Sequence, residues 1–177
     1  GILERQFGGY GWGEDAFDRP VDIAAINDLE IYVVDFGNDR IVRFDRTLGL
    51  TTVLETRTGA VPFRFPVSVT VTDFGQLLVV DGENGRVIEL GKDDRVSRIF
   101  GGSGLGPGFL RKPVKVRSNG HERVLVQDDP GLVVFDTYGK HLRTLGKSTT
   151  GNFISFDHYG EGVVLLDSNA VRAGSIS

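Results

Sequence analysis

Three stretches of the sequence repeat one pattern and decide the fold: PVDIAAINDLEIYVVDFGNDRIVRFD (residues 20–45), PVSVTVTDFGQLLVVDGENGRVIEL (66–90) and PVKVRSNGHERVLVQDDPGLVVFD (113–136). Their leading prolines are 46 and 47 residues apart, and a shorter fourth copy occupies residues 153–172. A fixed period in the forties is the sequence signature of a repeat architecture. The chain is therefore expected to consist of stacked, similar units.

Each copy has the pattern of short strands. Val67, Val69 and Val71 alternate with polar residues, which is the period of a half-buried strand. Turn signals such as Asn84-Gly85 separate the apolar runs, and no stretch keeps a helical period for ten residues. Four short strands in each copy predict an all-β fold, a β-propeller with about four blades in this chain.

The first copy resembles the NHL repeat. It has the proline-led strand, the Tyr-Val-x-Asp strand ending at Asp35, the Gly-Asn-x-Arg turn ending at Arg40 and the Val-x-Phe-Asp strand ending at Asp45. The third copy replaces the Asn-x-Arg turn with residues 129–131, and the fourth lacks the leading proline. The resemblance covers nearly all of the chain and implies NHL-like propeller blades. It specifies the fold far more sharply than the function.

The length of 177 residues fits one domain. We expect a single propeller domain over residues 1–177, with blades at about 20–65, 66–112, 113–151, and 152–177 together with 1–7. Residues 2–7 match the outer strand of the other copies. Pairing of this strand with the last blade would close a four-blade ring and remove free edges. The alternative is part of a larger ring, because NHL-like propellers commonly have six blades.

Composition limits the class of protein. The net charge of −4, from 24 acidic and 20 basic side chains, argues against nucleic acid as a partner. The absence of cysteine excludes disulfides and thiolate metal sites. The longest apolar runs have four or five residues, too few for a membrane span. A chain without an initiator methionine is expected to be a processed product or a fragment, and a periplasmic or extracellular location is predicted, with a cytoplasmic one left open.

Aspartates recur at the end of the second strand of each copy: Asp35, Asp81, Asp128 and Asp167. We interpret them as residues that build the blade, because a carboxylate there can accept N–H groups of a tight turn. Arg40 and Arg86 follow five residues later and are placed to form a bidentate pair with the aspartate.

A glycine-rich connector before the first blade contains Tyr10 and Trp12, and the matching connector at 101–108 has no aromatic residue at these positions. Phe36 in a neighbouring turn is expected to extend the aromatic surface. Arg111 and Lys112, with Lys115 and Arg117, form a basic cluster that is expected to be a solvated or partner-facing patch. We predict a protein interface at Tyr10, Trp12, Phe36, Arg111 and Lys112. The alternative for Trp12 is that it folds back to seal a blade junction.

The polar face of the innermost strands is predicted to line the central channel. It carries Asp22, Lys115, Arg117 and Asp157. In a four-blade ring the first and third blades face each other, so Asp22 would meet Lys115 across the axis. These residues are either structural charge pairs or a site for a small anionic ligand.

No serine–histidine–acid set and no metal-ligand spacing is visible, and none of the three histidines lies on a predicted innermost strand. We therefore predict no catalytic residue, metal or cofactor, and expect that the chain is not an enzyme. The predicted function is a non-catalytic interaction or scaffold module, an accessory subunit of a larger assembly or an exported binding protein. Two alternatives are a carbohydrate or small-anion binder at the channel mouth and a metal-dependent propeller lyase or hydrolase.

Overall fold

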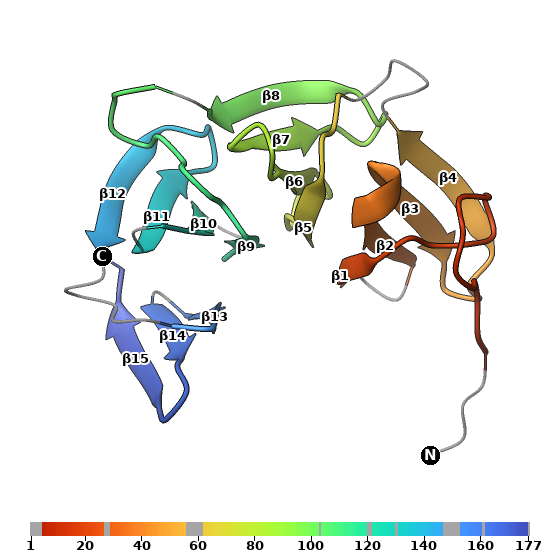
Figure 1. Cartoon of the computed structure of the whole chain (residues 1–177). Coiled ribbons are helices and arrows are strands. Elements are labelled where there is room, and N and C mark those ends of the chain that lie inside the picture. Colours follow the sequence, from red (N-terminus) through yellow and green to blue (C-terminus); the bar gives the residue numbers. More distant parts are fainter. Residues whose placement is uncertain are drawn as a thin grey trace.

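The computed structural model describes residues 5–26, 29–55, 62–102, 104–119, 122–129, 131–146, 153–160 and 162–176. These residues form four antiparallel sheets that stand side by side in an arc (Figure 1). Within each sheet the strands pair in chain order, and the first strand lies nearest the centre of the arc. The predicted all-β propeller arrangement with four blades is confirmed.

The blades share one strand plan. Blade 1 contains β1 (Pro20–Ile26), β2 (Glu30–Asp35), the short 3-10 turn η1 (Phe36–Asn38), β3 (Arg40–Asp45) and β4 (Leu50–Glu55). Blade 2 contains β5 (Pro66–Val71), β6 (Leu77–Asp81), β7 (Arg86–Leu90) and β8 (Val96–Gly101). Blade 3 contains β9 (Lys115–Ser118), β10 (Arg123–Asp128), β11 (Gly131–Asp136) and β12 (His141–Gly146). The described part of blade 4 contains β13 (Ser155–Tyr159), β14 (Gly162–Leu166) and β15 (Val171–Ser175).

The turn between the third and fourth strands has the same geometry in blades 1 to 3. One residue in each turn has a positive φ: 60° at Leu48, 62° at Asp94 and 77° at Gly139. A register shift in the strand pair accompanies each turn. A leucine at such a position is uncommon, so the surrounding blade, rather than the residue type, sets this turn.

The hydrophobic core lies between blades. One buried cluster joins blades 1 and 2, a second joins blades 2 and 3, and a third joins blades 3 and 4. Representative side chains of the three layers are Val34 with Val79, Val80 with Phe135, and Leu125 with Phe156. Each blade is therefore stabilised mainly by its neighbours, as expected when a single repeat cannot bury its own apolar faces.

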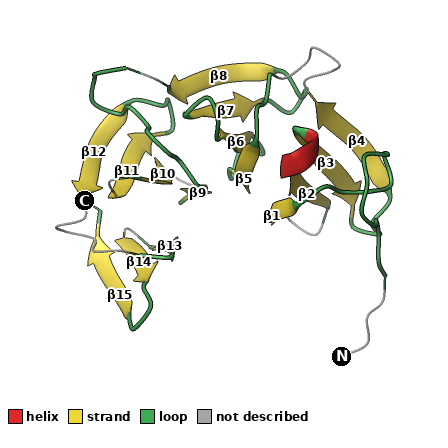
Figure 2. Ribbon diagram, in the orientation of Figure 1, coloured by secondary structure: helices red, strands yellow, loops and turns green. Residues whose placement is uncertain are grey.

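Blades 1 and 4 lie at the two ends of an open arc (Figure 2). Residues 5–7 form no strand, and the ring of Phe7 packs edge-on against Phe44 of blade 1 at a centroid distance of 4.6 Å. Residues 1–4 lie outside the described part. The expected pairing of residues 2–7 with the last blade is thus not formed by residues 5–7, because Phe7 buries its ring against blade 1 instead.

Candidate functional site

The repeated aspartates fasten each connector to its blade. The carboxylates of Asp35 and Asp81 accept the backbone N–H two residues before the leading proline of their blade, at 2.8 and 2.7 Å. Asp128 accepts the N–H of Arg111, at the same position, and that of Lys112. The carboxylates hold the incoming chain as well as the turn, so their role in these blades is structural.

The arginines of blades 1 and 2 extend this fastening. Arg40 is buried, and its Nε donates to Asp35 at 2.8 Å. Its Nη2 donates to two connector carbonyls, those of Gly13 and Ala16, at 2.9 and 2.6 Å. The predicted bidentate pair is therefore wrong: one N–H serves the carboxylate, because the other end of the guanidinium binds the connector. Arg86 divides its donors between Asp81 and the carbonyl of Pro62 in the same way.

The first connector, residues 8–17, is held in one shape by further hydrogen bonds. The N–H of Gly11 donates to the carbonyl of Phe17, and the N–H of Phe17 donates to the carbonyl of Gly9. Asn38 donates its side-chain N–H to the carbonyl of Gly11 at 3.1 Å. We call this segment the aromatic connector, and its backbone is fixed by residues of blade 1.

Two aromatic rings project from the aromatic connector. Tyr10 is 79 % exposed and Trp12 is 67 % exposed. Their rings meet at 62° with centroids 6.0 Å apart. Most of the Trp12 surface faces solvent, so the ring is not packed into a blade junction.

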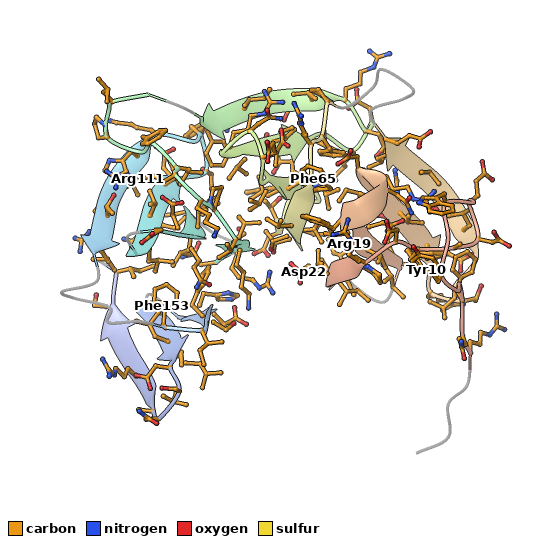
Figure 3. All side chains as sticks on the ribbon, viewed as in Figure 1. Tyr10, Arg19, Asp22, Phe65, Arg111 and Phe153 are labelled. Atoms are coloured by element: carbon orange, nitrogen blue, oxygen red, sulfur yellow. The ribbon has the colours of Figure 1, made fainter. Side chains whose placement is uncertain are left out.

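The other predicted interface residues lie elsewhere. Phe36 is half-buried and stacks on Phe65, with centroids 5.1 Å apart, while the guanidinium of Arg19 lies 4.9 Å from the Phe36 ring centroid. Arg111 and Lys112 are exposed on blade 3, and Figure 3 places Arg111 on the opposite side of the arc from Tyr10. Phe36 lies in η1 of blade 1, where Asn38 contacts the aromatic connector, whereas Arg111 and Lys112 lie in the connector that precedes β9 of blade 3.

Sequence reasoning missed the stack of Arg19, Phe36 and Phe65. Arg19 and Phe65 directly precede the leading prolines of blades 1 and 2, and both have positive φ, at 58° and 51°. Their shared position, directly before the leading proline of two copies of the repeat, was the signal in the sequence that could have pointed to this stack. A backbone held in this region by a non-glycine residue is sustained by its surroundings; here, for example, the N–H of Phe65 donates to the Asp39 carboxylate at 2.6 Å.

The innermost strands carry a second group of polar side chains, near the centre of the arc where Figure 3 labels Asp22. The Asp22 carboxylate accepts the Ser68 hydroxyl at 2.6 Å and the N–H of Val69 at 3.1 Å. A guanidinium N–H of Arg117 lies 3.5 Å from the same oxygen. The Ser68 hydroxyl in turn accepts the N–H of Val116. These bonds tie β1, β5 and β9 together.

Lys115 has a different partner from the predicted one. Its Nζ donates to the hydroxyl of Ser155 on β13, at 2.5 Å, instead of reaching Asp22. In the open arc, Arg117 of blade 3 reaches past Ser68 to Asp22, so the expected contact across the axis is replaced by contacts along the arc. Asp157 is largely exposed, and its carboxylate lies 3.2 Å from the His158 ring.

The pKa of Lys115 is lowered from its ordinary value. Partial burial disfavours the charged ammonium, and the neighbouring Arg117 adds repulsion, while Asp22 and Asp157 act in the opposite direction. The Lys115 ammonium thus has an uncharged hydroxyl as its hydrogen-bond partner and is partly buried. No group of three His, Asp or Glu side chains within the described residues could hold a metal ion. The absence of a cofactor remains a prediction.

The NHL repeat family matches residues 17–44. A comparison with curated proteins finds no match. Among solved structures, an inactive variant of virginiamycin B lyase from Staphylococcus aureus with quinupristin is 11 % identical, with a TM-score of 0.61 over 94 % of this chain and 57 % of that one. A streptogramin B lyase is 11 % identical, with a TM-score of 0.57 over 89 % and 55 %.

A putative 6-phosphogluconolactonase from Bacteroides uniformis is 12 % identical, with a TM-score of 0.63 over 91 % of this chain and 54 % of that one. The chain spans about half the length of these three structures. At such identities the likeness shows the shared fold alone.

These structures contradict the prediction that the chain is not an enzyme, because proteins with this fold include lyases. That prediction rested on the absence of a catalytic spacing along the sequence. A propeller brings residues from several blades to one place, so linear spacing is a poor guide to its sites.

None of the described segments forms a helix with the length and hydropathy that a membrane span requires. The repeat at residues 17–44 and the arrangement of the blades agree with each other. The chain thus has a match to the NHL repeat at residues 17–44 and the fold of a β-propeller.

Proposed function

We propose that the chain is a protein-interaction module that contacts its partner through the aromatic connector. The observation that carries this proposal is the pair of exposed rings, Tyr10 and Trp12, on a backbone fixed by Asn38 and Arg40. Aromatic side chains are the residues that most often dominate binding energy at protein interfaces. A loop already held in its binding conformation loses little conformational entropy on docking.

The proteins that co-purify with the unchanged chain from its source are first identified by mass spectrometry. The test then compares the affinity of such a partner for the unchanged chain and for Trp12→Ala. Removal of the ring is expected to weaken the partner's affinity by about 2 kcal/mol, roughly thirtyfold, as for a central aromatic anchor. The melting temperature should not change, because the ring is largely exposed.

Tyr138→Ala is the matched control, since Tyr138 is an aromatic residue with 76 % exposure in the β11–β12 turn of blade 3. It should leave the affinity unchanged. A partner that binds Trp12→Ala as tightly as the unchanged chain would contradict the proposal. Unfolding of Trp12→Ala would contradict it as well, because the ring would then stabilise the fold.

A second candidate function, binding of a small anion near the centre of the arc, is favoured by the environment of Lys115. Its ammonium has an uncharged hydroxyl as its hydrogen-bond partner, and burial and Arg117 lower its pKa. A bound anion would favour the charged form and therefore raise this pKa.

Lys115 is expected to titrate below 10.5, its ordinary value, in the free protein and to shift upward when inorganic phosphate is added. NMR of the ¹³C-methylated lysines measures both values, and the signal of Lys115 is assigned by its loss in Lys115→Gln. A Lys115 titration that is the same with and without phosphate would eliminate this candidate.

A further inference from the structure

A cavity of about 320 Å³ lies between blades 1 and 2, on the face opposite the aromatic connector. Its walls come from the β1–β2 turn and from the β5–β6 and β7–β8 turns, together with β2 and β3. The side chains that matter for its chemistry are Leu29, Glu30, Tyr32, Arg43, Phe74 and Lys92. Its volume is at the lower end of the range for small-ligand sites.

The floor of the cavity is a polar network between the two blades. Arg43 forms ion pairs with Asp94 of blade 2 and with Glu30, the latter at 3.5 Å. The Tyr32 hydroxyl donates to Glu30 at 2.7 Å. Burial, and next the bond to Glu30, raises the pKa of Tyr32, so this hydroxyl stays a donor at neutral pH.

One donor of this network has no acceptor within the described residues. The Nε of Arg43 is buried and forms no hydrogen bond there, although both of its Nη atoms are paired. A buried donor without an acceptor costs free energy. The network at the floor of the cavity is therefore not fully satisfied by the protein's own groups.

The charges around the cavity have both signs. Glu30, Asp73 and Asp94 are carboxylates, while Arg43 and Lys92 are cations. A simple anion would meet three carboxylates, and a simple cation would meet two positive groups. Hydroxyl groups both donate and accept hydrogen bonds, so a neutral polyhydroxylated molecule can bind acids and bases together.

Two apolar side chains stand at the rim. Leu29 is 63 % exposed and Phe74 is 65 % exposed, and they lie in corresponding turns of adjacent blades. A planar aromatic ring offers a face for the C–H groups of a ligand that also carries polar groups.

A second cavity, of about 300 Å³, continues the first toward the innermost strands. It is lined by Ala25, Ile26, Val71, Thr72 and Asp73, and it shares Ile26 and Asp73 with the first cavity. The two together form the blade 1–2 groove. We propose that the blade 1–2 groove binds a neutral carbohydrate, with one sugar ring against Phe74 and its hydroxyls on Arg43 and the carboxylates.

Saturation-transfer NMR tests this proposal with four probes: the methyl glycosides of glucose, galactose and mannose, and the disaccharide cellobiose. At least one probe is expected to receive saturation from the full chain. Phe74→Ala should weaken its affinity about tenfold or more, which corresponds to the loss of apolar contact with one aromatic ring. This variant should remain folded, because Phe74 is mostly exposed.

Trp12→Ala is the matched control, since it removes an exposed aromatic ring on the opposite face and should leave sugar binding unchanged. The inference is thereby independent of the proposed protein interface. Three results would overturn it: no saturation transfer to any probe, equal binding to Phe74→Ala, or a Phe74-dependent site that takes spermidine or inorganic phosphate but no sugar.

Discussion

Asp35→Ala is expected to lower the free energy of unfolding by about 3–5 kcal/mol, the usual loss when one partner of a buried ion pair is removed. The Asp35 carboxylate is fully buried, and its partner Arg40 is 3 % exposed. The substitution leaves that guanidinium in the interior without its carboxylate, and it also removes the acceptor for the N–H of Asp18 and for the Asn38 side chain. For a chain of this length the melting temperature should fall by roughly 6–20 °C.

Asp167→Ala is the matched control, because Asp167 has the corresponding position in blade 4. Its carboxylate accepts two N–H groups of its own turn and pairs with Arg172, whose side chain is 57 % exposed. Water can solvate Arg172 after the loss of its partner, so the loss of stability should be smaller than for Asp35→Ala. Both variants are measured by thermal and urea unfolding. Equal losses would show that burial of the Asp35–Arg40 pair does not increase its contribution to the free energy of unfolding.

The positions of the blades were predictable from the sequence because they depend on local pattern. The leading prolines, the alternating valines and the aspartates before tight turns each report on the conformation of a few neighbouring residues. The predicted proline-led strands are observed to begin at Pro20 and Pro66. The third begins two residues after its proline, at Lys115. In this blade residues 129–131 replace the Asn-x-Arg turn of blades 1 and 2.

The side-chain partners were less predictable because they depend on how blades are placed relative to one another. Asp22 and Lys115 were expected to meet across a closed ring. In the open arc the acceptor for Lys115 is Ser155, and Asp22 pairs with Arg117, two residues further along the same strand. A polar face can be read from alternation, but the curvature of the arc decides which of its members meet.

The candidate sites were predictable to different degrees. Tyr10 and Trp12 stood out because the matching connector lacks aromatic residues, yet their exposure required the structure. The blade 1–2 groove joins turns that are far apart in the sequence, so no spacing indicates it. A usable signal was present only in hindsight: Leu29 and Phe74 are apolar residues inside polar turns.

Leu110→Ala is expected to lower the free energy of unfolding by about 2–5 kcal/mol, because it opens a cavity between blades 2 and 3. Leu110 is 1 % exposed and belongs to the buried layer that joins these blades. The space around it is already filled: a Cβ added to Gly101 would lie 2.6 Å from its Cδ1. Leu105 lies in the same connector and is fully exposed, so Leu105→Ala should leave thermal unfolding unchanged. Equal losses in the two variants would mean that the connector merely links the blades. A large difference would establish that it supplies a stabilising side chain to the layer between blades 2 and 3.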